Sequence, residues 1–367
     1  MKNKLVVWLF AVSTMVLSQD VATLVVTGSV HGQLDPCGWP KKPLGGLSRK
    51  YTAINYLRSI GKDPIILDAG DLLFTKPDFN DSIRDSEIYR GMMMLEGIER
   101  IGCDAINVGQ FELAAGLDVL KELSSKSSIP FLSANLLDPI SQDLIFNPYT
   151  FIDKGGIKFG IIGLTDLISD TVKNVLSVDY IVAGNNYLNL IEEKVDIKIL
   201  LINSDRSTYS KLTEIFPSAD LIFTSGSTFM TRPMMDQKED GPFVFSSGRE
   251  GRYLNQFDIR LVDGSNKIVN KSYYESKVRY LKKRIDRYAN KNPNLSLENI
   301  YIDQPEILEN IKISRNEIKR MKNILLQNIN SISFKNVAMS SEIKDNSEMF
   351  EYVKKALENT RELIARN

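Results

Sequence analysis

The stretch TGSVHGQL occupies residues 27–34 and directly follows an apolar run, ATLVV, at residues 22–26. Two further blocks have the same construction: LDAGD at residues 67–71 and NVGQFEL at residues 107–113. Each block follows a run typical of a buried strand and contains a glycine that lets the backbone turn. Because α/β proteins place their sites at the carboxyl ends of strands, these blocks predict both the fold class and the position of the site.

Around these blocks, residues 22–262 alternate short apolar runs with amphipathic stretches. Apolar spacing predicts helices over residues 47–60, 85–101 and 117–123. A hairpin is expected at Gly155 and Gly156, which separate two strand-like runs. Further strands are expected at residues 22–27, 65–68, 104–108, 130–134, 197–202, 221–223, 243–245 and 257–261. This order predicts an α/β fold in which parallel and antiparallel strand pairing coexist.

After about residue 271 the pattern becomes helical. Apolar residues at a spacing near 3.5 predict helices at about residues 278–288, 305–329 and 347–364, with Ser347 as the N-cap of the last. Such stripes pack on each other, on the main domain or on a partner, and packing within the chain is favoured over a second copy. We therefore expect a domain over residues 20–268 and a helical region over residues 269–367.

The composition suits a folded, exported protein. The chain has 367 residues, 43% of them hydrophobic, and its 46 Lys and Arg balance its 46 Asp and Glu. This balance does not favour a nucleic-acid or anionic-membrane partner, although the charge is spread unevenly in the C-terminal quarter. Lys2, Lys4 and the apolar run at residues 5–17 predict a signal peptide over residues 1–18, hence a periplasmic or extracellular protein without a transmembrane segment once processed. An uncleaved N-terminal anchor is the alternative.

The two cysteines suggest no particular chemistry. Cys37 lies in a loop rich in Pro and Gly, and Cys103 lies among apolar residues. A disulfide is permitted in an exported protein, but the spacing does not predict one, and two cysteines make no metal motif.

In their order along the chain, the blocks resemble the calcineurin-like metallophosphoesterases, and among them the 5′-nucleotidase-type branch. The family order is Asp-x-His-Gly, Gly-Gly-x-x-Arg, Asp-x-Gly-Asp, Asn-His-Glu-Phe, Ser-Ala-Asn, Gly-Ile-Ile-Gly-Leu-Thr and Gly-His-x-His. The corresponding stretches here lie at residues 29–32, 45–49, 68–71, 110–113, 133–135, 160–165 and 225–228. The resemblance covers about residues 22–262. It implies a four-layer αββα sandwich with mixed sheets, to which a C-terminal helical segment is added.

The resemblance also implies a chemistry that this sequence only partly supports. In such enzymes two divalent metals about 3.5–4 Å apart activate a water for attack on phosphorus. His31 and the bridging Asp71 are retained, whereas Gln110 and Asn203 are neutral substitutes at ligand positions. The position of the catalytic histidine is taken by Phe111, which cannot transfer a proton. The remaining ligand positions fall on Ser29, Gly226 and Thr228.

Charge decides what such a site can hold. His31 is the only histidine of the chain, and a pair of dications needs anionic and imidazole donors to offset lost hydration. We therefore expect no cofactor, or at most one weakly bound divalent metal (Mn, Zn, Mg or Ca) held by His31 and Asp71, with Glu112 as an alternative third ligand. Glu112 matches a family glutamate that supports the ligands without binding the metal. Arg232, Arg249 and Arg252 near the site could bind an anion.

Three functional hypotheses follow. The favoured one is an exported, catalytically inactive phosphoesterase-like protein, a pseudoenzyme with a binding or scaffold role and an unknown protein partner contacted through the C-terminal helices. The second is a metal-dependent phosphoester or nucleotide hydrolase with a reduced site. The third is a subunit of an envelope redox or surface assembly, although the chain has no Cys-x-x-Cys-His haem motif of its own.

Overall fold

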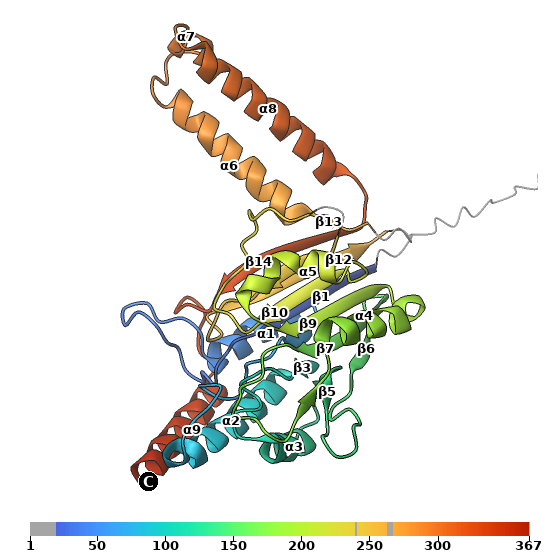
Figure 1. The fold of residues 1–367 in the computed structure, drawn as a ribbon. Helices are drawn as coiled ribbons and strands as arrows, with labels where there is room; N and C mark the ends of the chain where they lie inside the picture. The colour runs from blue at the N-terminus through green and yellow to red at the C-terminus, as the bar shows by residue number, and fades with distance from the viewer. Residues whose placement is uncertain (1–19, 239–240, 263–266, 367) are drawn as a thin grey trace, which may run out of the picture.

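A computed structural model describes residues 20–238, 241–262 and 267–366. The predicted signal peptide, residues 1–18, lies outside this part of the chain. Two β-sheets face each other, and helices cover both outer faces (Figure 1). The predicted four-layer αββα sandwich with mixed sheets is confirmed. No helix in the described ranges is long and apolar enough to cross a membrane.

The first sheet has seven strands in the order β13-β14-β12-β1-β2-β3-β4. Strand β1 pairs in parallel with β2 and antiparallel with β12, and β2, β3 and β4 continue in parallel. The bounds of the strands are β1 Asp20–Thr27, β2 Ile65–Asp68, β3 Ala105–Asn107, β4 Phe131–Leu132, β12 Tyr253–Leu261, β13 Val269–Asn270 and β14 Ser331–Ala338. Its parallel strands are connected through α1 Leu47–Ser59, α2 Asp81–Ile101 and α3 Leu117–Lys126.

The second sheet has five strands in the order β11-β10-β9-β7-β6. All its pairings are parallel except the β6–β7 hairpin, which turns at Gly155 and Gly156 as predicted. The bounds are β6 Tyr149–Lys154, β7 Ile157–Thr165, β9 Ile197–Asn203, β10 Leu221–Ser225 and β11 Phe243–Ser246, with the separate pair β5 Leu136–Leu137 and β8 Leu176–Ser177. The outer helices are α4 Tyr180–Ile191 and α5 Leu212–Ile215. A short 3-10 turn at Glu192–Lys194 follows α4, and another at Arg206–Lys211 precedes α5.

The alternating direction of side chains along the strands explains how the layers form. Successive side chains of a strand point to opposite faces, so Leu24 and Val26 lie between the sheets, whereas Val25 packs among the helices of the first sheet. In the second sheet Ile199 and Leu201 face the other sheet, whereas Leu200 faces α4. Continuous apolar runs are therefore needed, because both faces of these strands are buried.

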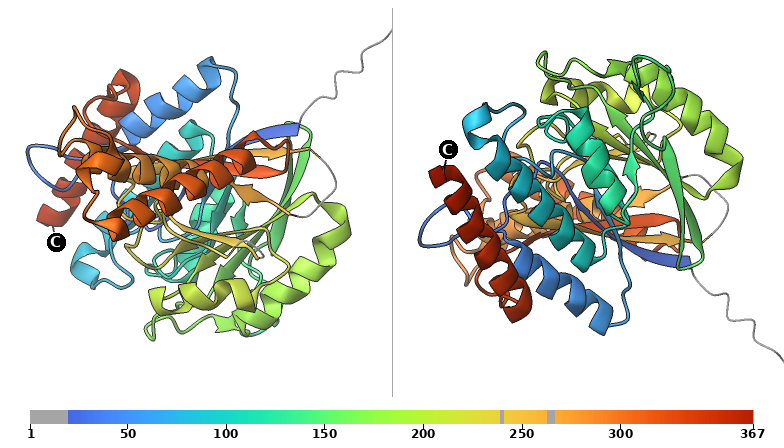
Figure 2. Two further views of the ribbon diagram at one scale, coloured as in Figure 1. Left: turned by 90° about the horizontal axis from the view of Figure 1, so that it is seen from above. Right: turned by 90° about the horizontal axis from the view of Figure 1, so that it is seen from below.

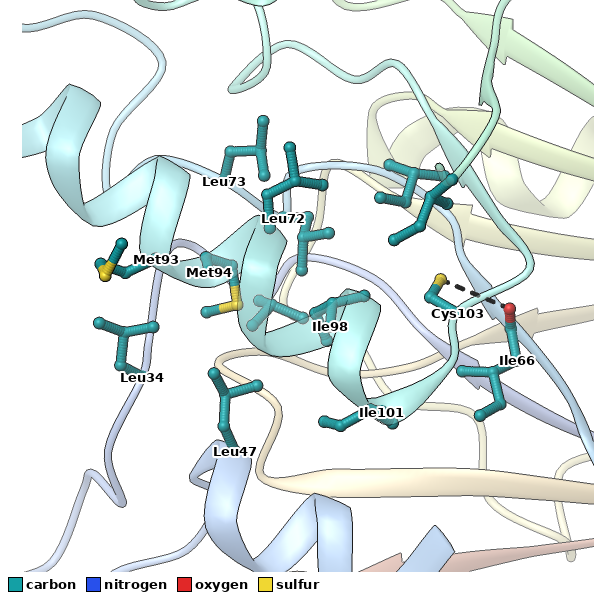
Figure 3. Packing of buried hydrophobic residues seen from close by; sticks show 14 of the residues in the cluster. Leu34, Leu47, Ile66, Leu72, Leu73, Met93, Met94, Ile98, Ile101 and Cys103 are labelled. Carbon is teal, nitrogen blue, oxygen red and sulfur yellow. Dashed lines mark hydrogen bonds between the residues drawn. The ribbon is translucent and has the colours of Figure 1, made fainter. Parts of the chain in front are cut away.

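One side chain cluster joins α2 to the loops that carry the site. Met93, Met94 and Ile98 of α2 lie in one buried cluster with Leu72 and Leu73, which follow β2 (Figure 3). Packing of this kind holds the loops on a rigid base. The thiol of Cys103 lies in the same cluster, as the apolar neighbours of this residue suggested, and donates a hydrogen bond of 3.5 Å to the carbonyl oxygen of Ile66.

The C-terminal region contains a strand that the sequence analysis missed. Strand β14 pairs antiparallel with β12 along eight residues, from Tyr253 with Ala338 to Arg260 with Ser331. The buried Ile332 and Phe334 alternate with residues of the other face, which was the available signal. After this strand, α9 (Ser347–Arg366) packs on α1 and α2 (Figures 1 and 2).

The other C-terminal helices leave the sandwich. Helices α6 (Lys271–Ala289) and α8 (Pro305–Leu326) pack against each other, with α7 (Leu297–Ile300) at the far end, and project from the sheet (Figure 1). We call residues 271–326 the helical arm. Its buried side chains form two small clusters of their own, around Val278 and Ile311.

One predicted detail is wrong. Ser347 is the first residue of α9 and not its N-cap, because the side chain oxygen of Asn346 accepts the hydrogen bond from the backbone N–H of Met349, at 2.9 Å.

Candidate functional site

The predicted site residues gather at the carboxyl ends of β1, β2, β3, β9 and β10. Ser29 and His31 follow β1, and Asp71 follows β2. Asn203 is the last residue of β9, and Gly226 follows β10. Residues Gln110, Phe111 and Glu112 follow β3 at a distance of a few residues. Parallel strands place these ends at one edge of each sheet, and the two edges face one another.

The loops after β1 and β2 are joined through their backbones. The N–H of Ser29 donates to the carbonyl oxygen of Gly70 at 2.9 Å, and the N–H of His31 donates to that of Asp71 at 2.8 Å. Ser29, His31 and Asp71 have φ angles of 52°, 57° and 58°. Residues other than glycine rarely adopt this left-handed conformation, which is concentrated at functional sites. The two retained family positions are thus held in adjacent, constrained loops.

Asp71 is buried, and its carboxylate accepts a backbone hydrogen bond. Its Oδ1 accepts from the backbone N–H of Phe111 at 3.1 Å. Burial raises the pKa of Asp71 to about 6, although hydrogen bonds from the Phe111 N–H, the Asn203 side chain and the Gly226 N–H oppose this rise. One oxygen of the carboxylate is therefore already bonded to a neutral backbone N–H group.

Glu112 holds the backbone of the two loops together. Its carboxylate accepts four backbone N–H hydrogen bonds of 2.6–3.0 Å, from Asp71, Leu72, Leu73 and Gly109. These bonds use all the lone pairs of the two oxygens. Burial, followed by the nearby charge of Asp71, raises the pKa of Glu112 to about 7. The geometry fits the supporting position that the resemblance implies for this residue.

The imidazole of His31 stacks on the ring of Phe111. The ring centroids are 4.4 Å apart and the planes differ by 19°. Burial lowers the pKa of His31 to about 4, and the charge of Arg249 adds to this effect, against the opposing charge of Glu250. The imidazole is therefore neutral at neutral pH, and its nearest aromatic neighbour has no proton to transfer.

Both polar atoms of the Asn203 side chain have hydrogen-bond partners within the protein. Its Oδ1 accepts the N–H of Gln110 at 3.0 Å, and its Nδ2 donates to Ser225 Oγ at 2.7 Å. The Ser225 hydroxyl in turn donates to the carbonyl oxygen of Ala69, also at 2.7 Å. This hydroxyl links the two sheets, and the sequence analysis did not select it; its position at a strand end was the only signal.

The space beside Asp71 is filled by backbone. A Cβ on Gly109 would lie 2.7 Å from Asp71 Oδ1 and 3.0 Å from Asn203 Cγ. Gly226 N–H donates to Ser29 Oγ at 3.2 Å, so this degenerate position also contributes a donor to the site. Thr228 is exposed, two residues further along the chain.

The three arginines do not form an open anion site. The carboxylate of Glu250 pairs with Arg252 and lies 3.8 Å from Arg249, and it also accepts a hydrogen bond of 3.1 Å from the thiol of Cys37. Arg232 is exposed. Cys37 and Cys103 are both free thiols.

These donors do not fit a two-metal centre. One carboxylate, one imidazole and two neutral amides provide too little negative charge to replace the hydration of two dications. Within residues 20–238, 241–262 and 267–366, no group of three or more His, Cys, Asp or Glu side chains is arranged to hold a metal ion.

Known proteins resemble this chain in sequence and in fold. A 5′-nucleotidase of Vibrio parahaemolyticus is 33% identical over 249 residues, which are 66% of this chain and 39% of the relative. The 5′-nucleotidase precursor of Thermus thermophilus matches the structure with a TM-score of 0.63 at 17% identity, over 94% of this chain and 59% of that one. The calcineurin-like phosphoesterase YfkN of Bacillus subtilis matches with a TM-score of 0.59 at 15% identity, over 95% and 99%. No protein-family model matches the sequence.

The sandwich and the position of its polar loops define the class of protein, a phosphoesterase-type α/β fold. In sequence the chain is similar to 5′-nucleotidases, and in fold it is similar to a 5′-nucleotidase precursor and to a calcineurin-like phosphoesterase. It spans about two-fifths of the length of the first curated relatives that it matches.

Proposed function

We propose that this chain is a catalytically inactive, exported phosphoesterase-like protein that works as a binding or scaffold module. The observation that supports this most is the environment of Asp71, whose buried carboxylate accepts the backbone N–H of Phe111 at 3.1 Å. In an active relative we would expect cations at this carboxylate. The stacking of His31 on Phe111 supports the same conclusion, because the ring at the catalytic position cannot protonate a leaving group.

The test combines metal content with turnover. Purified protein is incubated with Mn²⁺, dialysed and analysed for bound metal, and its hydrolysis of a generic phosphodiester and of a nucleotide is measured beside a His31→Ala variant. We expect less than one equivalent of metal and equal, background turnover in both proteins. Two equivalents of metal with turnover above that of the variant would overturn the proposal.

A hydrolase with a reduced site is the second candidate, since His31 and Asp71 are retained and the relatives are named 5′-nucleotidases. In that case His31, Asp71, Gln110 and Asn203 would hold a single metal that polarises a phosphoryl oxygen. One equivalent of metal with turnover that His31→Ala abolishes would favour this candidate. The third hypothesis, a subunit of an envelope redox or surface assembly, predicts a stable partner protein in pull-downs from the native source.

A further inference from the structure

The neutral overall charge of the chain hides a separation of charge between the helical arm and the rest. Residues 271–326 contain 13 Lys and Arg and seven Asp and Glu. Because the whole chain is balanced, the remainder carries an acidic excess of the same size. The arm projects from the sandwich, so its positive charge is displaced from the acidic body (Figure 1).

The basic side chains are arranged in a row on α6. Arg279, Lys283 and Arg287 recur every four residues, which places them on one side of the helix, and all three are exposed. Within the described part of the chain, none of them lies within 4 Å of a carboxylate, whereas Lys312 and Arg315 of α8 have acidic partners. Like charges at this spacing destabilise a helix by about 0.2–0.5 kcal/mol per pair, so the row does not serve the stability of α6.

Exposed apolar side chains accompany these cations. Tyr280 lies beside the row on α6, Ile313 projects from α8, and Ile302 at the far end is 71% exposed. The side chains that hold the arm together belong instead to its two inner clusters. An arm that carries both exposed cations and exposed aromatic and aliphatic groups has the combination that binds the interface of an anionic bilayer.

We propose that the helical arm docks on a membrane surface that contains anionic phospholipids. The three cations of the row extend over about 12 Å of α6 and are not gathered at one point. A fluid layer of headgroups can rearrange to meet such a row, whereas a folded protein would need a fixed complementary surface. The acidic body is repelled by the same membrane, so the molecule would be oriented with its arm toward the lipid. This proposal is independent of whether the site hydrolyses phosphoesters.

The test is flotation of the full chain with vesicles of phosphatidylcholine alone and of phosphatidylcholine mixed with phosphatidylglycerol. The arm variant carries Arg279→Glu, Lys283→Glu and Arg287→Glu. The matched control carries the same three reversals on α9, where Lys354, Lys355 and Arg361 are exposed. The apolar run at residues 5–17 could bind both kinds of vesicle, so the difference between the two vesicles is the quantity compared.

We expect the chain to partition onto anionic vesicles, more weakly as salt is raised, and the arm variant to lose about 100-fold in that partitioning while the control changes little. Equal binding to neutral vesicles, or an equal loss in the control, would overturn the proposal. Tighter binding to a DNA duplex than to anionic vesicles at the same salt would also overturn it. If the arm variant fails to fold, as judged by circular dichroism, replacement of the same residues by Gln provides the comparison.

Discussion

At the scale of residues, the site joins two constrained loops around one buried carboxylate. Asp71 and His31 lie in these loops, where Asp71 accepts the N–H of Phe111 and His31 is stacked on the Phe111 ring. Through the resemblance, the sequence predicts which positions have lost a ligand. It could not show that the Phe111 N–H turns toward Asp71, because this bond joins residues 40 positions apart.

Glu112 should be indispensable to the fold of these loops. In Glu112→Gln an amide NH₂ would face two backbone N–H donors whichever way the amide turned, so those donors would lose their acceptor. We expect the free energy of unfolding to fall by about 2–4 kcal/mol in urea titrations. Glu122→Gln is the control, because Glu122 is exposed and should change stability by less than about 0.5 kcal/mol. Equal stability of the two variants would contradict this prediction.

Asp220 should make stability depend on pH. Burial raises the pKa of this carboxyl from 3.8 to about 6, against the hydrogen bond of 2.7 Å from the Lys198 N–H. At a pH between these two pKa values the folded state binds more protons than the unfolded state. The free energy of unfolding therefore falls as the pH rises from about 4 to about 6.

The difference between wild type and Asp220→Asn isolates this residue, since asparagine can still accept the Lys198 hydrogen bond. Over that range we expect the wild type to lose about 2 kcal/mol more than the variant, measured by urea unfolding at each pH. The same pH slope in both proteins would show that Asp220 does not titrate in this way.

At the scale of elements, most strands and helices follow from apolar periodicity, because the sandwich buries both faces of its central strands. Strand β14 was missed since it follows long helices and has no companion strand beside it in sequence. Its partner, β12, lies about 70 residues earlier. Only the assembled sheet therefore shows that the chain after the helical arm returns to the first sheet and continues to α9.

Strand β14 should contribute to the stability of the whole sandwich. Phe334 is buried, with its ring centroid 4.7 Å from that of Phe245 and 5.5 Å from that of Phe257. We expect Phe334→Ala to reduce the free energy of unfolding by about 3–5 kcal/mol, because it leaves a cavity between the sheets. Lys335→Ala, at an exposed position of the same strand, should have little effect. Equal stability of the two variants in thermal and urea unfolding would contradict the prediction.

At the scale of the whole molecule, the protein combines a rigid sandwich with a projecting helical arm. The sandwich has continuous cores between and outside its sheets, whereas the arm depends on two small clusters and on a limited contact with β14. Stability is therefore unevenly distributed over the molecule.

Amide hydrogen exchange should reveal this difference. We expect the amides of α6 and α8 to exchange faster than those of β1 and β9, because few buried apolar contacts oppose local opening of the arm. Peptide-resolved mass spectrometry measures both regions in one experiment. Equal protection of the arm and the central strands would show that the arm is as firmly held as the sandwich.

The sequence by itself determined the α/β class and the order of the blocks at strand ends. These follow from local pattern and residue chemistry, which need no knowledge of distant contacts. Tertiary structure decided the rest: the return of β14 to the first sheet, the separation of the helical arm, and the N–H of Phe111 at the Asp71 carboxylate. Each of these depends on which distant segments lie together, and burial fixes that only when the whole chain packs.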